Sequence, residues 1–367
     1  MKTVCDLNKC VGCHACEELC PKAAIKISDS LENMNAVIDK DLCIECGICS
    51  KVCQVIEPID KYEPIKWYQG WSENENVRRT SSSGGMAAEL SKTILKSGGV
   101  VCSCVFENGK FIFKLTDSME QAKKFAGSKY VKSDASGIYK EIKKHLNKDE
   151  TVLFIGLPCQ CAGVKKAVSN IKKGELYTAD LICHGTPSPK VLNTFLNQYK
   201  MNLENVETLS FRDKGRFSLR VNEKYIIAQK TMDCYSIAFL NGLSYTENCY
   251  ECAYADSKRI TDITIGDSWG TELADSGKGV SLILCNTEKG KLLAESSNVY
   301  LTDADRERSI ATNPQLSAPT FKPEKREAFF NALRKGKPFN AAVMTCCTNK
   351  WFRQFVKRQL IRLKLVG

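Results

Sequence analysis

The sequence lacks the long apolar runs and the leader that mark membrane-spanning and secreted proteins. No stretch approaches the roughly 18 consecutive apolar residues that a transmembrane helix needs. The first residues, Met1–Asp6, lead directly into a cysteine motif and carry no signal peptide. We therefore expect a cytoplasmic protein without a transmembrane segment.

Signs of disorder are also missing, and cysteine is abundant. The 367 residues are 43% hydrophobic and 26% charged, which is ordinary for a globular protein of two or three domains. There are twenty cysteines. Disulfide frameworks belong to oxidising compartments and small domains, so in a chain without a leader we expect these thiols to stay reduced and to serve as ligands.

Eight cysteines form two runs of identical spacing, the second 33 residues after the first. This internal duplication resembles the bacterial two-cluster ferredoxin pattern, in which three closely spaced cysteines bind one iron–sulfur cube and the fourth binds the other. The pattern assigns one 4Fe–4S cluster to Cys10, Cys13, Cys16 and Cys53, and a second to Cys43, Cys46, Cys49 and Cys20.

The alternative for these runs is a pair of structural zinc sites. Zinc motifs usually bring cysteines in pairs or with histidine at other spacings, so the spacing favours iron–sulfur clusters. The second run departs from the first at one position, where Gln54 replaces the proline that follows the first run. We expect Gln54 to touch no ligand.

A formal net charge of +11 raises the question of nucleic-acid binding. Each oxidised four-thiolate cluster carries a charge of about −2, so three clusters would offset roughly half of this excess. No nucleic-acid recognition fold is visible in the sequence. We therefore expect no nucleic-acid partner.

A linker with two prolines, residues 55–64, places the first domain boundary near residue 60. Beyond it, apolar runs that predict strands alternate with stretches that predict helices, which indicates an α/β core with parallel pairing. An Asn108-Gly109 turn predicts one hairpin. The predicted strands are 66–71, 99–106, 110–115, 151–156, 176–182 and 263–265, and the predicted helices are 86–96 and 138–146.

Two segments of this second domain could bind phosphate. The turn Ser82-Ser83-Gly84-Gly85 opens a helix, so its free backbone N–H groups and the helix dipole favour an anion, although a simple helix cap explains it equally well. The segment 126–134 is polar and basic around a central tyrosine, which suits a phosphate or a stacked ring.

Four further cysteines stand at strand ends or in short loops, namely Cys159, Cys183, Cys249 and Cys252. A CxxC pair with two distant single cysteines is a plausible four-thiolate site. Spacing alone leaves three interpretations open: a third iron–sulfur cluster, a zinc site, or unrelated thiols.

The C-terminus, residues 350–364, interleaves basic and apolar residues. This pattern predicts a basic amphipathic helix that lies on the surface of a partner protein or of a membrane. On a membrane, the contact would be peripheral. The alternative is a solvated terminal helix that packs on its own domain.

Seven short motifs occur in the order seen in the beta subunits of coenzyme F420 hydrogenases and dehydrogenases, and the chain resembles that family over essentially its whole length. A fused N-terminal ferredoxin resembles the electron-input subunit of the reduced-deazaflavin dehydrogenase. The motifs are Ser82–Gly85, Gly127–Tyr130, Gly156–Gln160, Asp180–Gly185, Phe211–Lys214, Cys249–Cys252 and Ser268–Gly270.

The resemblance implies a flavoprotein, usually binding FAD, with a 4Fe–4S cluster beside the flavin. It places the ligands of this third cluster at Cys159, Cys183, Cys249 and Cys252, and the flavin contacts at Ser82, Ser83, Gly84, Gly85, Ser128, Lys129, Tyr130 and Ser133. No catalytic residue is assigned. His184 is a candidate proton donor, or else a hydrogen-bond partner of cluster or flavin.

The expected fold class is α/β, with a bacterial-type ferredoxin domain (1–60), a larger mixed α/β flavin and iron–sulfur domain (61–340) and a basic C-terminal helix (341–367). The expected function is electron transfer between a hydride-carrying small molecule, such as reduced coenzyme F420, and a one-electron protein partner, such as ferredoxin or a reductase. FAD would take up the electron pair and release the electrons one at a time into a chain of three 4Fe–4S clusters. The alternative is an electron-delivery module without an organic substrate, serving a partner reductase.

Overall fold

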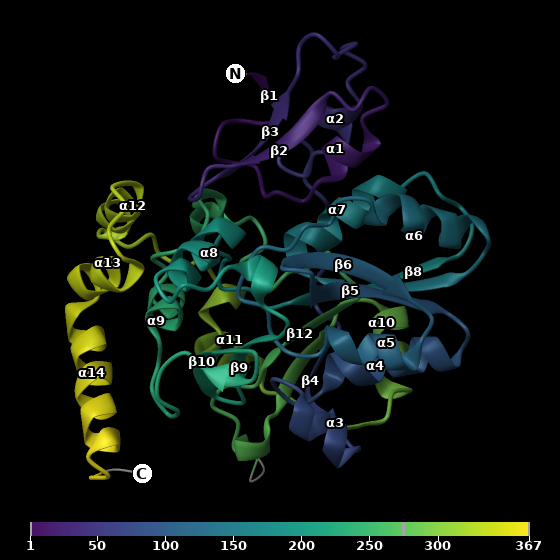
Figure 1. Ribbon diagram of the computed structural model, residues 1–367. Helices are drawn as coiled ribbons and strands as arrows, with labels where there is room; N and C mark the ends of the chain where they lie inside the picture. Colours follow the sequence, from purple (N-terminus) through teal and green to yellow (C-terminus); the bar gives the residue numbers. More distant parts are fainter. Residues whose placement is uncertain (1, 274–275, 366–367) are drawn as a thin grey trace.

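A computed structural model describes residues 2–273 and 276–365, and shows a mixed α/β architecture (Figure 1). An eight-stranded sheet forms the centre, and a small N-terminal domain packs on the helices that cover one of its faces. In spatial order the strands are β14 (Val299–Asp303), β4 (Lys66–Ser72), β13 (Ser281–Cys285), β12 (Ile263–Asp267), β8 (Glu175–Leu181), β7 (Thr151–Gly156), β5 (Val100–Glu107) and β6 (Lys110–Thr116).

The middle of the sheet is parallel, as the alternation of strands and helices predicts. Strands β12, β8, β7 and β5 pair in parallel, and β6 returns antiparallel to β5 through the expected hairpin. These strands are apolar on both faces because helices cover both. One face packs against α4 (Met86–Lys96) and α10 (Glu288–Glu295), and the other against α6 (Ile138–Asn147) and α7 (Pro158–Val168).

The N-terminal domain consists of a small antiparallel sheet and two short helices. Its strands lie in the order β1 (Lys2–Thr3), β3 (Met34–Ile38) and β2 (Ile25–Asp29), and its helices are α1 (Ala15–Leu19) and α2 (Ile48–Lys51). Left-handed residues recur at the repeat spacing: Gly12 and His14 before α1, Glu45 and Gly47 before α2. The duplication seen in the sequence is therefore also a duplication of backbone geometry.

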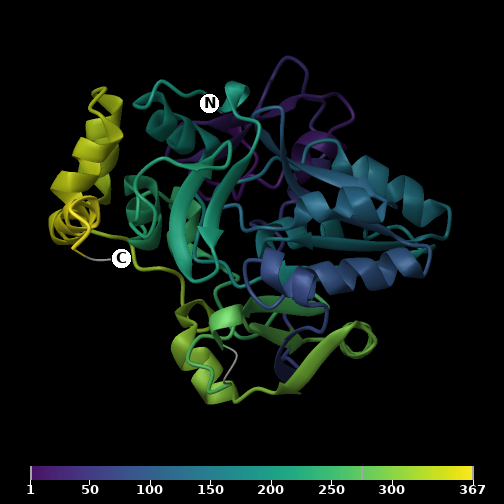
Figure 2. The ribbon, with the colours of Figure 1, turned by 60° about the horizontal axis from the view of Figure 1, so that its bottom comes forward.

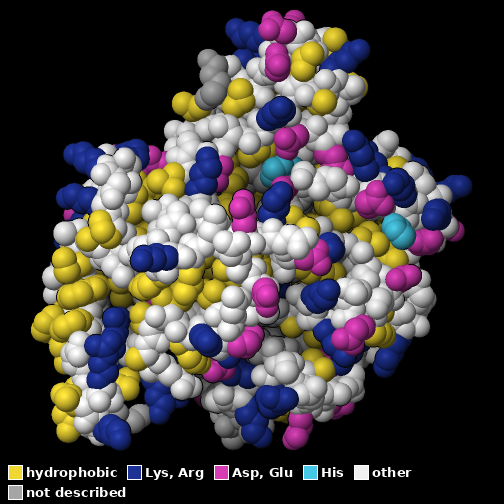
Figure 3. All heavy atoms as spheres, viewed as in Figure 1, with side chains coloured by type: hydrophobic (Ala, Val, Ile, Leu, Met, Phe, Trp, Pro, Cys, Tyr) yellow, Lys and Arg dark blue, Asp and Glu magenta, His cyan; other side chains and the backbone are white. Residues whose placement is uncertain are grey.

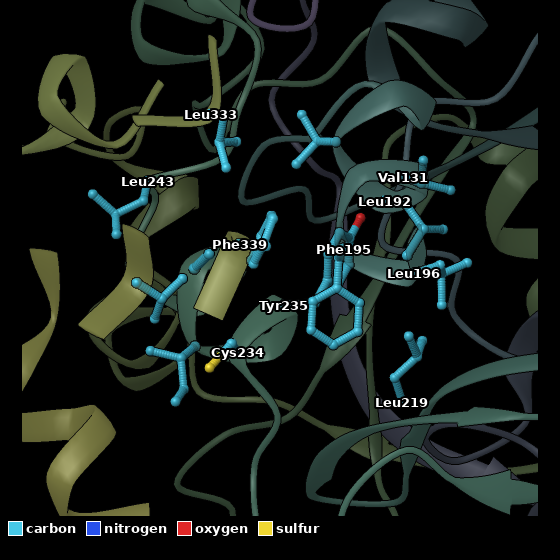
Figure 4. Close-up of a cluster of buried hydrophobic side chains, with 14 of the residues drawn as sticks. Val131, Leu192, Phe195, Leu196, Leu219, Cys234, Tyr235, Leu243, Leu333 and Phe339 are labelled. Carbon is cyan, nitrogen blue, oxygen red and sulfur yellow. The ribbon is translucent and has the colours of Figure 1, made fainter. Parts of the chain in front are cut away.

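A further antiparallel sheet was not predicted. Together with helices from distant parts of the chain, it surrounds the largest cluster of buried apolar side chains among the described residues (Figures 2 and 4). Phe195, Tyr235 and Phe339 lie at the centre of this cluster. Its elements are β9 (Leu209–Asp213), β10 (Arg216–Val221), β11 (Lys224–Tyr225), α8 (Pro189–Asn197), α9 (Cys234–Leu240), α12 (Arg326–Arg334) and α13 (Phe339–Cys346).

The remaining helices lie at the surface. They are α3 (Glu75–Thr80), α5 (Met119–Ala122), α11 (Arg306–Thr312) and α14 (Thr348–Arg362). Short 3₁₀ turns occur at η1 (Lys123–Phe125), η2 (Leu203–Asn205), η3 (Glu247–Glu251), η4 (Ser276–Lys278) and η5 (Pro314–Leu316). Within the described residues, no helix is long and apolar enough to cross a bilayer.

Candidate metal centres and cofactor site

The first predicted ligand set is gathered in one place. Cys10, Cys13, Cys16 and Cys53 line a common pocket beneath β3 and α1, and all four are buried or nearly so. Cys5, which was not predicted as a ligand, lines the same pocket. Its thiol hydrogen-bonds to Cys10 and Cys53 and lowers the pKa of these two thiols to about 7 and about 6. Backbone amides also point at sulfur, as Gly12 N–H does at Cys10 Sγ (3.4 Å).

The second predicted set lies toward the outer end of the same domain. Cys20, Cys43 and Cys49 pack against the apolar cluster that holds the first set, whereas Cys46 is exposed. The amide of Ala24 donates to Cys20 Sγ (3.3 Å). This arrangement places one cysteine set inside, against the α/β domain, and the other near solvent.

The third set comes together from three separate segments. Cys159 lies in the first turn of α7, Cys183 follows β8, and Cys249 and Cys252 lie in and after the η3 turn. Burial raises the pKa of the Cys159 thiol, and the three other sulfurs add to this effect by charge repulsion. The Thr246 hydroxyl lies 3.4 Å from Cys249 Sγ.

Each of the three sets offers four thiols, the usual ligands of iron–sulfur cubes, and such a cube presents four separate iron atoms, one for each cysteine. A zinc ion would instead draw its ligands to within about 2.3 Å of one point. Among residues 2–273 and 276–365, no three His, Cys, Asp or Glu side chains are arranged that closely.

Gln54 links the first and third sets, and the expectation that it touches no ligand is wrong. Its side chain is only 5% exposed. Its amide nitrogen donates to the backbone carbonyl of Cys159 (2.6 Å), and its carbonyl accepts from the Tyr254 hydroxyl (2.6 Å). It also hydrogen-bonds to Cys13. A glutamine can reach across the domain boundary here, whereas the proline of the first repeat has no polar side chain with which to do so.

Lys132 is a second buried link between the same sets. Its ammonium donates to the carbonyl of Val11 in the N-terminal domain (3.1 Å), and the residue is 3% exposed. Burial lowers the pKa of Lys132, but electrostatic interaction with the sulfurs of Cys249, Cys159, Cys10 and Cys183 outweighs burial and holds this pKa above its usual value. This lysine therefore stays protonated between the two sets of sulfurs.

The N-terminal domain is tied closely to α6 and α7. The Tyr139 hydroxyl donates to the carbonyl of Cys13, and the Glu18 carboxylate accepts the amides of Tyr139 (3.2 Å) and Lys140 at the start of α6. Gly163 in α7 permits this approach, since a Cβ there would lie 2.7 Å from the Tyr139 oxygen and 3.2 Å from Cys13 Cβ. The two domains share a buried interface.

The two predicted flavin segments meet, although they lie far apart in the sequence. The amide of Ser128 donates to Ser82 Oγ (2.9 Å), and Ser133 Oγ accepts from Gln160 Nε2 (2.9 Å), next to Cys159. Tyr130 stacks on Phe239 with ring centroids 4.5 Å apart. The predicted flavin residues are thus adjacent to the third cysteine set.

An ion pair that was not singled out from the sequence stands beside them. Arg212 binds Asp267 through two hydrogen bonds (2.7 and 3.0 Å) and lies over the rings of Phe217 and Trp269. The Lys214 amine donates to the carbonyl of Ser83 (3.3 Å). Both cations belong to the Phe211–Lys214 motif. The charged residues of this motif were the signal in the sequence that could have pointed to the ion pair.

Two details of the expected phosphate cradle differ from the prediction. The Gly84 amide is not free, because it donates to Ser281 Oγ (3.1 Å), and a Cβ at Gly84 would lie 2.5 Å from the Gly70 carbonyl oxygen. The Lys129 amine turns toward its own loop and donates to the carbonyls of Phe125 and Ala126 (2.7 and 2.9 Å). His184, the candidate proton donor, is exposed at the edge of this region.

Comparison with known proteins agrees with this arrangement. Residues 9–55 match the family described as a 4Fe-4S dicluster domain. Residues 67–140 and 149–305 match the N-terminal and C-terminal regions of the coenzyme F420 hydrogenase/dehydrogenase beta subunit. Together these matches cover most of the N-terminal domain, most of the central sheet and all twelve predicted ligand cysteines.

Similar individual proteins come from species of Methanosarcina and Methanocaldococcus. One subunit of the F(420)H(2) dehydrogenase of Methanosarcina mazei is 21% identical over 71% of this chain and 78% of its own length. The coenzyme F420-dependent sulfite reductase of Methanocaldococcus jannaschii is 23% identical over 88% of this chain, which spans about half (51%) of that protein. A chain of the F420-reducing NiFe hydrogenase complex from Methanosarcina barkeri matches 71% of this chain and is itself 92% covered, with 18% identity and a TM-score of 0.43. The chain belongs to the family of coenzyme F420 hydrogenase/dehydrogenase beta subunits and carries a 4Fe–4S dicluster domain at its N-terminal end.

Proposed function

We propose that the protein is an iron–sulfur flavoprotein oxidoreductase that passes electrons between a hydride-carrying substrate, reduced coenzyme F420 or a similar molecule, and a one-electron partner. FAD would exchange the hydride, and three 4Fe–4S clusters would carry single electrons. The family membership supports the general chemistry. The order of the three cysteine sets supports the course of the path through the chain.

The observation that carries this proposal is the hydrogen bond from Gln54 to Cys159. Gln54 follows Cys53 directly in the chain, so a continuous connection of covalent bonds and one 2.6 Å hydrogen bond joins a ligand of the inner dicluster set to a ligand of the third set. Tyr254 fixes the amide orientation by donating to its carbonyl. The two sets are thereby held next to each other by the protein itself.

The other end of the path lies near solvent. Cys46 is exposed, and large apolar side chains around it are exposed as well: Leu42 (51%), Ile44 (57%) and Ile48 (37%). Such a small apolar patch beside an outer cluster suits transient docking of a one-electron protein partner. Figure 3 shows hydrophobic side chains among charged ones on the N-terminal domain at the top of the molecule.

Fixed charged side chains lie beside the predicted flavin segments, where the substrate would bind. The Arg212–Asp267 pair is mostly buried and fixes the guanidinium beside Tyr130, while Lys214 is anchored over the Ser82–Gly85 turn. A fixed guanidinium and a nearby ammonium favour anionic groups of a cofactor or substrate. Ser82 and Ser128 position these segments relative to each other.

An anaerobic experiment tests this function. The loaded protein should contain about twelve irons and twelve sulfides per chain, together with one FAD. It should then be mixed separately with reduced coenzyme F420, NADPH and reduced ferredoxin, while flavin and cluster absorbance are followed. Bleaching of flavin before clusters by an organic donor is the expected result. Eight irons would remove the third cluster, and reduction only by ferredoxin would instead favour an electron-delivery module.

A further inference from the structure

The C-terminal helix α14 presents an apolar stripe away from the body of the protein. Phe352, Phe355, Val356 and Leu363 are 57%, 38%, 37% and 67% exposed. At 3.6 residues per turn these four side chains fall within an arc of about 100°. They therefore form one continuous face and not a scatter of single exposed residues, which would need no explanation.

The opposite side of α14 is held to its own domain. Trp351 packs against the large apolar cluster, and Gln354 accepts a hydrogen bond from the amide of Met232 (2.9 Å). Lys350 donates to the side chain of Asn241. The helix is thus fixed in orientation, and the apolar stripe faces outward in the folded protein. A helix is present at residues 348–362, whereas residues 341–346 of the expected C-terminal helix belong to the separate helix α13. Helix α14 packs on its domain with one side and exposes the stripe on the other.

The charge around the stripe has one sign. From residue 328 to the C-terminus the sequence contains nine Lys or Arg and no Asp or Glu. Arg353 and Lys357 flank one edge of the stripe and Arg362 the other. Figure 3 shows hydrophobic side chains beside Lys and Arg along the left edge, over α13 and α14. The matched family regions end at residue 305, so this segment lies outside them.

We propose that α14 docks the protein on a lipid bilayer surface that contains anionic lipids. An apolar stripe between cationic edges is the pattern of a helix that lies in the membrane interface, where the stripe enters the acyl boundary and the cations meet headgroup phosphates. Two copies of α14 placed face to face would bring like charges together, which opposes pairing through this face. The proposal is independent of the redox function.

Vesicle sedimentation of the full-length, cofactor-loaded protein tests the proposal. Binding is expected to vesicles of phosphatidylglycerol and phosphatidylcholine, and to be lost on pure phosphatidylcholine. Arg353→Glu/Lys357→Glu should weaken binding at least roughly 30-fold, because each cation near an anionic surface contributes about a factor of five. Phe352→Ser/Leu363→Ser should also weaken it, since the stripe no longer inserts.

The matched control is Lys172→Glu/Lys173→Glu, which removes two exposed cations between α7 and β8. This variant should bind vesicles like the wild-type protein. Iron content and the far-ultraviolet circular dichroism spectrum show that each variant is folded. Two results would overturn the proposal: loss of vesicle binding by the control as large as by Arg353→Glu/Lys357→Glu, or wild-type binding by the Phe352/Leu363 variant. Either result would show that binding is only nonspecific charge attraction. Dimers by light scattering that the Phe352/Leu363 substitution abolishes would also overturn the proposal, because a second copy would then cover the stripe.

Discussion

The side-chain amide of Gln54 donates a 2.6 Å hydrogen bond to the backbone carbonyl of Cys159, across 105 residues of sequence. Gln54 is shielded from solvent, and the Tyr254 hydroxyl completes the arrangement. This hydrogen bond therefore joins the dicluster domain to α7, the helix that carries the first cysteine of the third set. Its removal should affect both stability and electron transfer.

Replacing Gln54 by leucine tests this link. The substitution leaves the Cys159 carbonyl and the Tyr254 hydroxyl without their partner, so we expect the free energy of unfolding to fall by about 1–3 kcal/mol. In rapid-mixing experiments, the proposed flavin should be reoxidised more slowly after its reduction than in the wild-type protein. Gln121→Leu, at an exposed position of α5, is the control. Equal rates in both variants would exclude Gln54 from the electron path.

Lys132 should set the potentials of the clusters beside it. A buried cation stabilises the more negative, reduced form of a cluster, so Lys132→Met should lower the midpoint potential by on the order of 50–100 mV. Redox titration followed by electron paramagnetic resonance measures this shift. Lys132→Arg keeps the charge and should retain most of the potential. Unchanged potentials in the methionine variant, with full iron content, would contradict the assignment.

Glu18 should stabilise α6, although it belongs to the other domain. Helix α6 follows Gly137 and has no capping side chain of its own, and the Glu18 carboxylate accepts two of its first amides. We expect Glu18→Ala to lower the free energy of unfolding by about 1–2 kcal/mol, the usual cost of a lost cap. Chemical denaturation measures this change. Glu45→Ala, an exposed acidic residue in the second repeat, should have a much smaller effect.

Ser82 should contribute to flavin retention. Its hydroxyl joins the two segments expected to contact FAD, so Ser82→Ala should raise the FAD dissociation constant by on the order of tenfold. Flavin absorbance per chain after dialysis measures it, with the exposed Ser136→Ala as control. Gly84→Ala is unsuitable for this purpose, because its Cβ would clash with the Gly70 carbonyl and destabilise the sheet. Undiminished flavin in the Ser82 variant would place the cofactor elsewhere.

Local signals predicted much of the central domain. The helix at 86–96 and the strand at 151–156 have the predicted bounds, and the Asn108-Gly109 hairpin is present. These elements depend on apolar periodicity and on turn residues that act within a few positions. Strands β9 to β11 were not predicted. They are short, and their burial depends on helices α12 and α13, roughly one hundred residues later.

The residues of the site also divide into those that a local sequence pattern identifies and those that only the folded chain identifies. The cysteines were recognisable because ligand spacing is a local pattern. Gln54 and Lys132 were not, because their importance depends on partners that only the folded chain brings near. The predicted boundary near residue 60 is also more than a linker, since Tyr62 and Arg259 exchange two backbone hydrogen bonds (2.6 and 2.8 Å). A proline-rich segment shows where a chain turns, but not what it then contacts.

The cap that Glu18 places on α6 would couple the stability of this helix to the metal content of the N-terminal domain. Glu18 lies between two predicted ligands, Cys16 and Cys20, so a chain that has received no iron would hold this carboxylate loosely. The first turn of α6 would then fray, and the segment before it would become accessible to proteases. A chain without iron would then be cleaved more readily in front of α6 than a loaded chain.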